Sequence, residues 1–332
     1  MRMYITGTAS VLPLNNRVEK STTDDSIGLS DVSYLDYIAP NLLRRMGKLI
    51  RMAVASAKIA LQKAEVEIPE AIIVGTGLGC LTDTKRFLND LCTSQESVVS
   101  PTAFIQSTHN IIAGQVALLL NCTGYNSTYS DRSHSFEQAL LDARLHLMEG
   151  TDSILVGAAD ECIDMVENVV KALDEANGAA IKDSFLGEGS SFFVVTKIKK
   201  RNAIEVRDLK IIPRVTKSDL RSELSMFLLD NKLEASEIDV IILGDWPESE
   251  DSYYRVITDS FKKSTPSVYY KKQCGHYFTS SAYALDTACY ILKNQRIPEN
   301  MLPSRPLLRE ARNILIYSHY KGSKHSFYLI SK

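Results

Sequence analysis

Apolar runs and helical periodicities alternate along this chain from its beginning to its end. Residues 71–75 form a short apolar run that is typical of a strand buried on both faces. Residues 42–64 instead place Leu49, Ala53 and Ala57 along one helical face, where the alanines suit close packing. The same patterns predict strands over 4–14, 153–158, 190–196, 204–212, 239–243, 313–317 and 326–330, and helices over 83–91, 111–120, 164–175, 219–231 and 252–262, with a small-residue helix ending at 292.

Strands that alternate with helices favour a layered α/β architecture with largely buried sheets. A charged polar run over residues 197–202 is the best internal boundary. The elements after it follow an order similar to those before it, without a repeat at the level of single residues. We therefore predict two similar halves, over residues 1–200 and 201–332.

The composition narrows the class of protein. A chain of 332 residues with 45% hydrophobic content is ample for a large core. The net charge of −2 and the absence of long Lys/Arg runs argue against nucleic acid or an anionic membrane as a partner. Six cysteines without CxxC spacing, and no signal peptide, predict reduced thiols in a cytoplasmic protein. No apolar run approaches the roughly 18 to 20 residues that a membrane-spanning helix needs.

No cofactor and no metal ion are predicted from the motifs. The glycine-rich segment over 75–79 lacks the full dinucleotide spacing, and no P-loop lysine follows it, which leaves a tight strand-to-helix turn as its interpretation. His109 and His134 have no metal-ligand companions at a useful spacing.

Residues 127–161 carry the most chemical information. They are predicted to form a strand, a sharp turn, a helix rich in small residues and a second strand. This segment resembles the nucleophile segment of β-ketoacyl-acyl-carrier-protein synthases, in which a cysteine at the turn begins a buried helix whose dipole lowers the thiol pKa. Ser133 occupies that position here. A hydroxyl has a far higher pKa than a thiol, so a reactive Ser133 needs a general base within hydrogen-bond reach.

Further blocks resemble the same family, in the same order, along nearly the whole chain. They are residues 5–13, 74–79, 100–101 with Asn110, 113–117, 150–152 with 157–161, 187–189 and 271–276. Each block alone is weak evidence for the family, whereas the combination of all of them is specific for it. The resemblance implies an α/β protein with a thiolase-like fold of five αβαβα layers, which dimerises across a strand near the nucleophile.

Departures from the family pattern fall on catalytic positions. The family resemblance implies two histidines and a supporting lysine that stabilise the oxyanion and promote decarboxylation of a malonyl partner. The first histidine falls at Gly244, whereas Lys271 and His276 match the lysine and the second histidine. Lys321 stands in the place of a gatekeeper phenylalanine, and Gly322 is retained from the glycine-rich turn that bears it.

Several of these positions have two interpretations. Ser133 is either an inert residue that fills the space of the cysteine or a hydroxyl activated by His276, which is itself either functional or a structural inheritance. Asp245 and Trp246 either reshape the pocket floor beside the missing imidazole or simply fill volume. Phe104 either borders an acyl tunnel at the dimer contact or only packs at that interface.

Two other features near these positions have structural interpretations. Asp131 and Arg132 place opposite charges just before Ser133, where the family prefers small neutral residues, and a buried pair of this kind costs desolvation unless it is well bonded. Cys274 lies on the wrong element to replace the lost nucleophile, so we expect it to contribute packing.

We therefore interpret the chain as a catalytically degenerate, ketosynthase-like subunit that resembles the chain-length factors of polyketide, fatty-acid or aryl-polyene systems. The resemblance implies an acyl carrier protein as a partner, together with either an active ketosynthase subunit in a heterodimer or a second copy of this chain. Three alternatives stay open: an active 3-oxoacyl-acyl-carrier-protein synthase with altered residues, a Ser133/His276 acyltransferase or thioesterase, and a homodimeric scaffold that binds the carrier protein.

Overall fold

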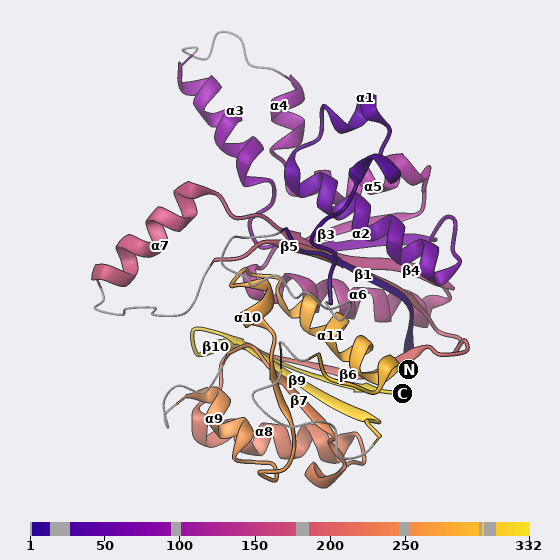
Figure 1. The fold of residues 1–332 in the computed structure, drawn as a ribbon, viewed down its shortest axis with the longest axis vertical. Coiled ribbons are helices and arrows are strands. Elements are labelled where there is room, and N and C mark those ends of the chain that lie inside the picture. The colour runs from indigo at the N-terminus through magenta and orange to yellow at the C-terminus, as the bar shows by residue number, and fades with distance from the viewer. Residues whose placement is uncertain are drawn as a thin grey trace.

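Among the residues described in the computed structural model of this chain, ten strands form one mixed sheet (Figure 1). The structure describes residues 2–13, 27–93, 101–176, 186–245, 252–298, 301 and 310–332. Within this part of the chain, the strands are β1 (Met3–Val11), β2 (Ala71–Gly75), β3 (Tyr125–Tyr129), β4 (Ser153–Asp160), β5 (Gly189–Thr196), β6 (Ile204–Ile212), β7 (Val240–Leu243), β8 (Ser267–Tyr269), β9 (Asn313–Tyr320) and β10 (Ser323–Ser331).

The two halves of the sheet have the same topology. The strand order is β3-β2-β4-β5-β1 in the N-terminal half and, from the opposite edge, β8-β7-β9-β10-β6 in the C-terminal half. In the N-terminal half, β2 pairs in parallel with β3 and β4, and β5 pairs antiparallel with β4 and β1. In the C-terminal half, β7 likewise pairs in parallel with β8 and β9, and β10 pairs antiparallel with β9 and β6. This repetition confirms the prediction of two similar halves, whereas a domain division at residue 200 stays a prediction.

Three pairs of helices complete five layers. These pairs are α2 (Lys48–Ala64) with α5 (Ile111–Leu120), α6 (Ser135–Glu149) with α11 (Ser281–Asn294), and α8 (Lys217–Asp230) with α9 (Tyr253–Thr258). The middle pair shares one core with inward-facing side chains of both half-sheets, such as Val156 and Ile316. The first pair covers the outer face of the N-terminal half-sheet and the last pair covers that of the C-terminal half-sheet. The αβαβα layering is therefore confirmed.

The remaining helices lie around the layers. They are α1 (Pro40–Leu43), α3 (Leu81–Thr93), α4 (Pro101–Gln106), α7 (Asp164–Ala176) and α10 (Lys271–Cys274), with 3-10 turns at Tyr34–Asp36, Arg132–His134 and Ala235–Glu237. Helices α3 and α7 project from the layered body (Figure 1). Within the described ranges, no helix combines the length and the apolar character needed to cross a membrane.

Close packing between layers explains the sequence of the N-terminal half. Every residue of β2 is buried, because helices cover both faces of this half-sheet, and its sequence is continuously apolar as a result. A Cβ atom at Gly7 of β1 would lie only 2.1 Å from the carbonyl oxygen of Ala60. Only glycine therefore allows α2 to approach β1 this closely.

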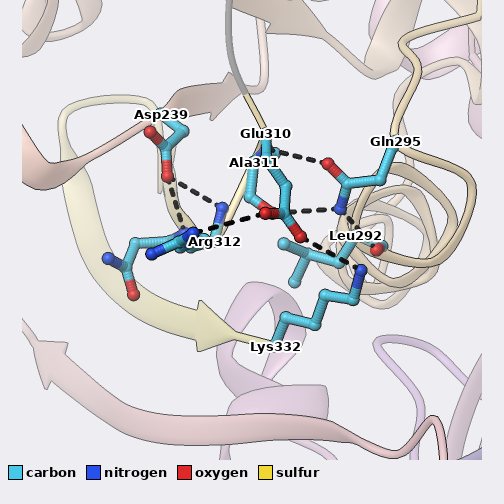
Figure 2. Close-up of polar contacts among 8 residues, drawn as sticks. Asp239, Leu292, Gln295, Glu310, Ala311, Arg312 and Lys332 are labelled. Carbon is cyan, nitrogen blue, oxygen red and sulfur yellow. Dashed lines mark hydrogen bonds and ion pairs between the residues drawn. The ribbon is translucent and has the colours of Figure 1, made fainter.

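A polar network fastens the end of the central helix α11 to strand β9 (Figure 2). Gln295 follows α11 with a positive φ of 56° and exchanges two hydrogen bonds with the backbone of Ala311, at 2.8 and 3.0 Å. Next to it, Asp239 accepts hydrogen bonds from the backbone N–H groups of Arg312 at 2.8 Å and Asn313 at 3.0 Å. These contacts fix the register at which β9 enters the sheet beside β7.

Candidate functional site

The turn between β3 and α6 carries Ser133, as predicted. The Ser135 side chain closes this turn, because its Oγ accepts from the backbone N–H of Asp131 at 2.8 Å and donates to the carbonyl of Arg132 at 2.7 Å. Arg132 has a φ of 52°, in the left-handed region that residues with a Cβ rarely adopt. The expectation of a buried pair between Asp131 and Arg132 is wrong. Arg132 is exposed, and the carboxylate of Asp131 instead contacts Lys324 of β10.

The hydroxyl of Ser133 forms no hydrogen bond to a base in the described part of the chain. Its Oγ exposes less than 1 Å² and has no hydrogen-bond partner among the described residues. A serine without such a partner keeps its proton and is a weak nucleophile. The interpretation in which His276 activates Ser133 needs a hydrogen bond between the two side chains, and that bond is not formed in this structure.

Lys271 and His276 converge on Asp245, which follows strand β7. The Nε2 atom of His276 lies 3.1 Å from Oδ1 of Asp245, and the Nζ atom of Lys271 lies 3.4 Å from Oδ2. Burial raises the pKa of Asp245, but the hydrogen bond from His276 and the charge of Lys271 outweigh burial and hold the pKa at about 2. Lys271 and His276 thus share one carboxylate as their common partner.

Burial alone would favour neutral Lys271. Its pKa is nevertheless raised, because the electrostatic effects of Tyr270 and Asp245 outweigh burial. The short helix α10 positions both residues, since Lys271 begins it and His276 follows it by two residues. Gly187 holds the end of the Lys271–His276 segment in place, because its backbone N–H donates to the carbonyl of His276 at 3.1 Å.

Tyr254 occupies the space beside Gly244 that an imidazole would need. A Cβ atom at Gly244 would lie 2.2 Å from the hydroxyl oxygen of Tyr254 and 3.1 Å from Cε of Lys271. Tyr254 comes from α9 and is 5% exposed, and its ring centroid lies 4.5 Å from that of His319. Among the described residues its hydroxyl has no hydrogen-bond partner. The sequence analysis missed this residue, because the spacing along the chain does not show which face of α9 meets β7.

The turn between β9 and β10 carries Lys321 and Gly322. Lys321 is exposed with a φ of 49°, and Gly322 has a φ of 71° and donates its N–H to Nδ1 of His319 at 3.1 Å. His319 was also missed; burial lowers its pKa to about 3, with Lys271 adding to the effect. His325 lies 5.6 Å from it between ring centroids and bonds the hydroxyl of Tyr317 at 2.8 Å.

Phe104 lies apart from these contacts. Phe104 on α4 is 57% exposed and its ring centroid lies 5.5 Å from that of Phe87. Its role at an acyl tunnel stays a prediction. Trp246 lies outside the described residues. Within the described ranges, no group of three or more His, Cys, Asp or Glu side chains is arranged to hold a metal ion.

Comparisons with known proteins identify the family and the fold. A sequence model of the family described as "Beta-ketoacyl synthase, N-terminal domain" matches residues 19–191, more than half of the chain. A search of curated protein sequences found no match.

Solved structures with the same fold align over the whole chain. The ishigamide ketosynthase/chain length factor has a TM-score of 0.76 and 16% identity, covering 100% of this chain and 99% of that one. AntDE:AntF, a type II PKS acyl-carrier protein in complex with its ketosynthase, has a TM-score of 0.73 and 15% identity, with 99% of each chain covered. The ketosynthase ApeO in complex with its chain length factor ApeC from Xenorhabdus doucetiae has a TM-score of 0.71 and 16% identity, covering 99% of this chain and 98% of that one.

Proposed function

This chain belongs to the β-ketoacyl synthase family, and on that premise we propose that it is a non-condensing subunit of the chain-length-factor kind. It acts beside an active ketosynthase in fatty-acid or polyketide biosynthesis. The observation that carries the proposal is the contact of His276 and Lys271 with Asp245. The nitrogen of His276 that binds this carboxylate is not free to donate the same N–H to a thioester oxygen.

Two further changes point the same way. Condensation requires a nucleophile that can be ionised, and the buried hydroxyl of Ser133 has no base among the described residues. It also requires an imidazole where Gly244 stands, and Tyr254 fills that space. The alternative of a Ser133/His276 acyltransferase needs a hydrogen bond between those two side chains, and the geometry weighs against it.

An unpaired sheet edge supports the subunit role. Within the described part of the chain, β3 pairs only with β2, which leaves its other edge open. Helices α5 and α6, which both contact β3, carry exposed large apolar side chains: Leu118 is 71% exposed, Leu145 is 56% exposed and Met148 is 57% exposed. An open edge beside apolar residues is a surface that proteins normally cover. A ketosynthase subunit that continues the sheet would cover it, and the neighbouring structure of ApeO is that of a ketosynthase in complex with its chain length factor.

The carrier protein is the second proposed partner. A subunit that helps to shape the acyl tunnel of an active synthase has to assemble where that synthase receives its substrates from a carrier protein. AntDE:AntF is a ketosynthase captured with its acyl-carrier protein and shares this fold. The proposed role requires shape and apolar lining from this chain, and the nucleophile from the partner alone.

Co-expression with a cysteine-bearing ketosynthase from the same source tests the proposal. We expect the two chains to elute together as a heterodimer in size-exclusion chromatography. Product formation by this pair should be unchanged by Ser133→Ala in our chain, because that hydroxyl takes no part in the reaction, and abolished by removing the cysteine of the partner. A homodimer that ignores the ketosynthase, or a pair inactivated by Ser133→Ala, would contradict the proposal.

A further inference from the structure

A small polar site lies inside the apolar middle layer, between α6, α11 and β10. Glu137 of α6, Ser281 at the start of α11 and Tyr328 of β10 are 1%, 2% and 0% exposed. Ser326 lies two residues before Tyr328 and so on the same face of β10, and its Oγ donates to Oε1 of Glu137 at 3.2 Å. The site therefore brings together helix α6 of the N-terminal half and two elements of the C-terminal half.

Three polar atoms of this site have no hydrogen-bond partner within the described ranges. They are Oε2 of Glu137, Oγ of Ser281 and Oη of Tyr328, and each exposes less than 1 Å². Buried polar atoms in proteins are nearly always hydrogen-bonded, because leaving one unsatisfied costs free energy. Three such atoms at one place point to a bound partner that is not a protein group.

The three groups lie within interaction range of one another. Burial raises the pKa of Glu137 to about 7, and Tyr328 and Ser281 oppose this shift. Burial and the charge of Glu137 raise the pKa of Tyr328, and Ser281 opposes that shift as well. Polar groups that influence one another without a direct hydrogen bond suit a bridging water.

We propose that Glu137, Ser281 and Tyr328 bind one ordered water molecule, which bridges α6, α11 and β10. Water can donate two hydrogen bonds and accept two, so it can satisfy the two hydroxyls and the carboxyl group together. A monovalent cation fits less well, because it accepts no hydrogen bond and leaves the hydroxyl hydrogens of Ser281 and Tyr328 without an acceptor. This water site belongs to the core, so it goes beyond the proposed function and does not depend on it.

A high-resolution crystal structure of the full chain tests the water site directly. We expect density for one water molecule at about 2.6 to 3.2 Å from Oε2 of Glu137, Oγ of Ser281 and Oη of Tyr328. Crystals soaked in rubidium chloride distinguish the two candidates, because Rb⁺ gives an anomalous signal and water does not. An anomalous peak between these three atoms, or no density there, would overturn the proposal.

Unfolding in urea tests the same site in solution. Tyr328→Phe keeps the ring and removes only the hydroxyl, so the variant should still fold. We expect the equilibrium constant of unfolding to rise about fivefold, which corresponds to the loss of one net hydrogen bond. Without a bound water, the same substitution would remove an unsatisfied buried hydroxyl and would leave the constant unchanged or lower it. That result would contradict the water site.

A double-mutant cycle shows whether two of the hydroxyls share one water. Combining Tyr328→Phe with Ser281→Ala should raise the unfolding constant by less than the product of the two single effects, because both remove partners of the same molecule. Tyr254→Phe is the matched control, since its hydroxyl is also buried and unpartnered among the described residues but belongs to the outer layer with α9. Combined with Ser281→Ala, it should give the simple product of the single effects. The same simple product for Tyr328→Phe with Ser281→Ala would argue decisively against a shared water.

Discussion

Gly187→Ala is expected to destabilise the folded chain by about 3 kcal/mol. A Cβ atom at this position would lie 1.9 Å from the carbonyl oxygen of Cys274 and 2.7 Å from Cα of Gly275. Both are backbone atoms, which cannot rotate away as a side chain can. The N–H of Gly187 also donates to the carbonyl of His276 at 3.1 Å, so the substitution pushes the whole Lys271–His276 segment away from Asp245.

Urea unfolding monitored by circular dichroism measures this loss. Gly114→Ala is the matched control, because a Cβ there meets nothing within 4 Å and the residue lies inside helix α5. It should stabilise the chain by about 0.5 to 1 kcal/mol, the helix-propensity difference between alanine and glycine. Equal effects of the two substitutions would show that the close approach at Gly187 does not exist in solution.

Glu137→Gln is expected to stabilise the protein at pH 8 by up to about 3 kcal/mol. Glu137 lies on α6, one turn after Ser133, and is 1% exposed. Burial raises its pKa to about 7, and hydrogen bonding, including the bond that Oγ of Ser326 donates to its carboxylate at 3.2 Å, lowers it only in part. The neutral amide of glutamine has the shape of the protonated acid and keeps an oxygen for Ser326, without the buried charge.

The sign of the pH dependence follows from the raised pKa. The folded protein retains the proton of Glu137 up to about pH 7, whereas the unfolded chain loses it near the ordinary value of 4.5. The stabilisation that Glu137 contributes to the free energy of unfolding is therefore fully present below about pH 4.5, falls as the pH rises, and is lost above about pH 7. The difference in unfolding free energy between Glu137→Gln and the parent should grow across this window.

Unfolding free energies at several pH values, from urea titrations, check this expectation. Glu149→Gln serves as the control on the same helix, because the side chain of Glu149 is 72% exposed. Its effect should stay within about 0.5 kcal/mol at every pH. A constant difference between Glu137→Gln and the parent would mean that Glu137 titrates normally, and would sink the interpretation of it as a buried neutral acid.

Most of the fold follows from periodicity in the sequence. The strand over 204–212 and the helix over 111–120 are found as predicted, since long runs with one clear period leave little ambiguity. Strand β8 was missed, because three residues are too few to show a period. The predicted helix over 42–64 is two helices, since residues 44–47 turn between α1 and α2.

The site was predictable only where a motif carries it. Lys271, His276 and Gly244 could be placed because each sits in a recognisable local pattern. The roles of Tyr254 and Lys324 could not, since each depends on a contact between elements far apart in the chain. The same limit explains the error at Asp131, whose expected partner was its sequence neighbour and whose observed partner lies 193 positions away.

The most direct test of the central claim is the intact mass of the isolated protein after incubation with an acyl-loaded carrier protein, with and without a malonyl-loaded carrier. We expect no acyl group on Ser133 and no chain lengthened by two carbons, while an active ketosynthase assayed in parallel shows both. An acyl adduct mapped to Ser133, or an elongated chain made by this protein alone, would contradict the account.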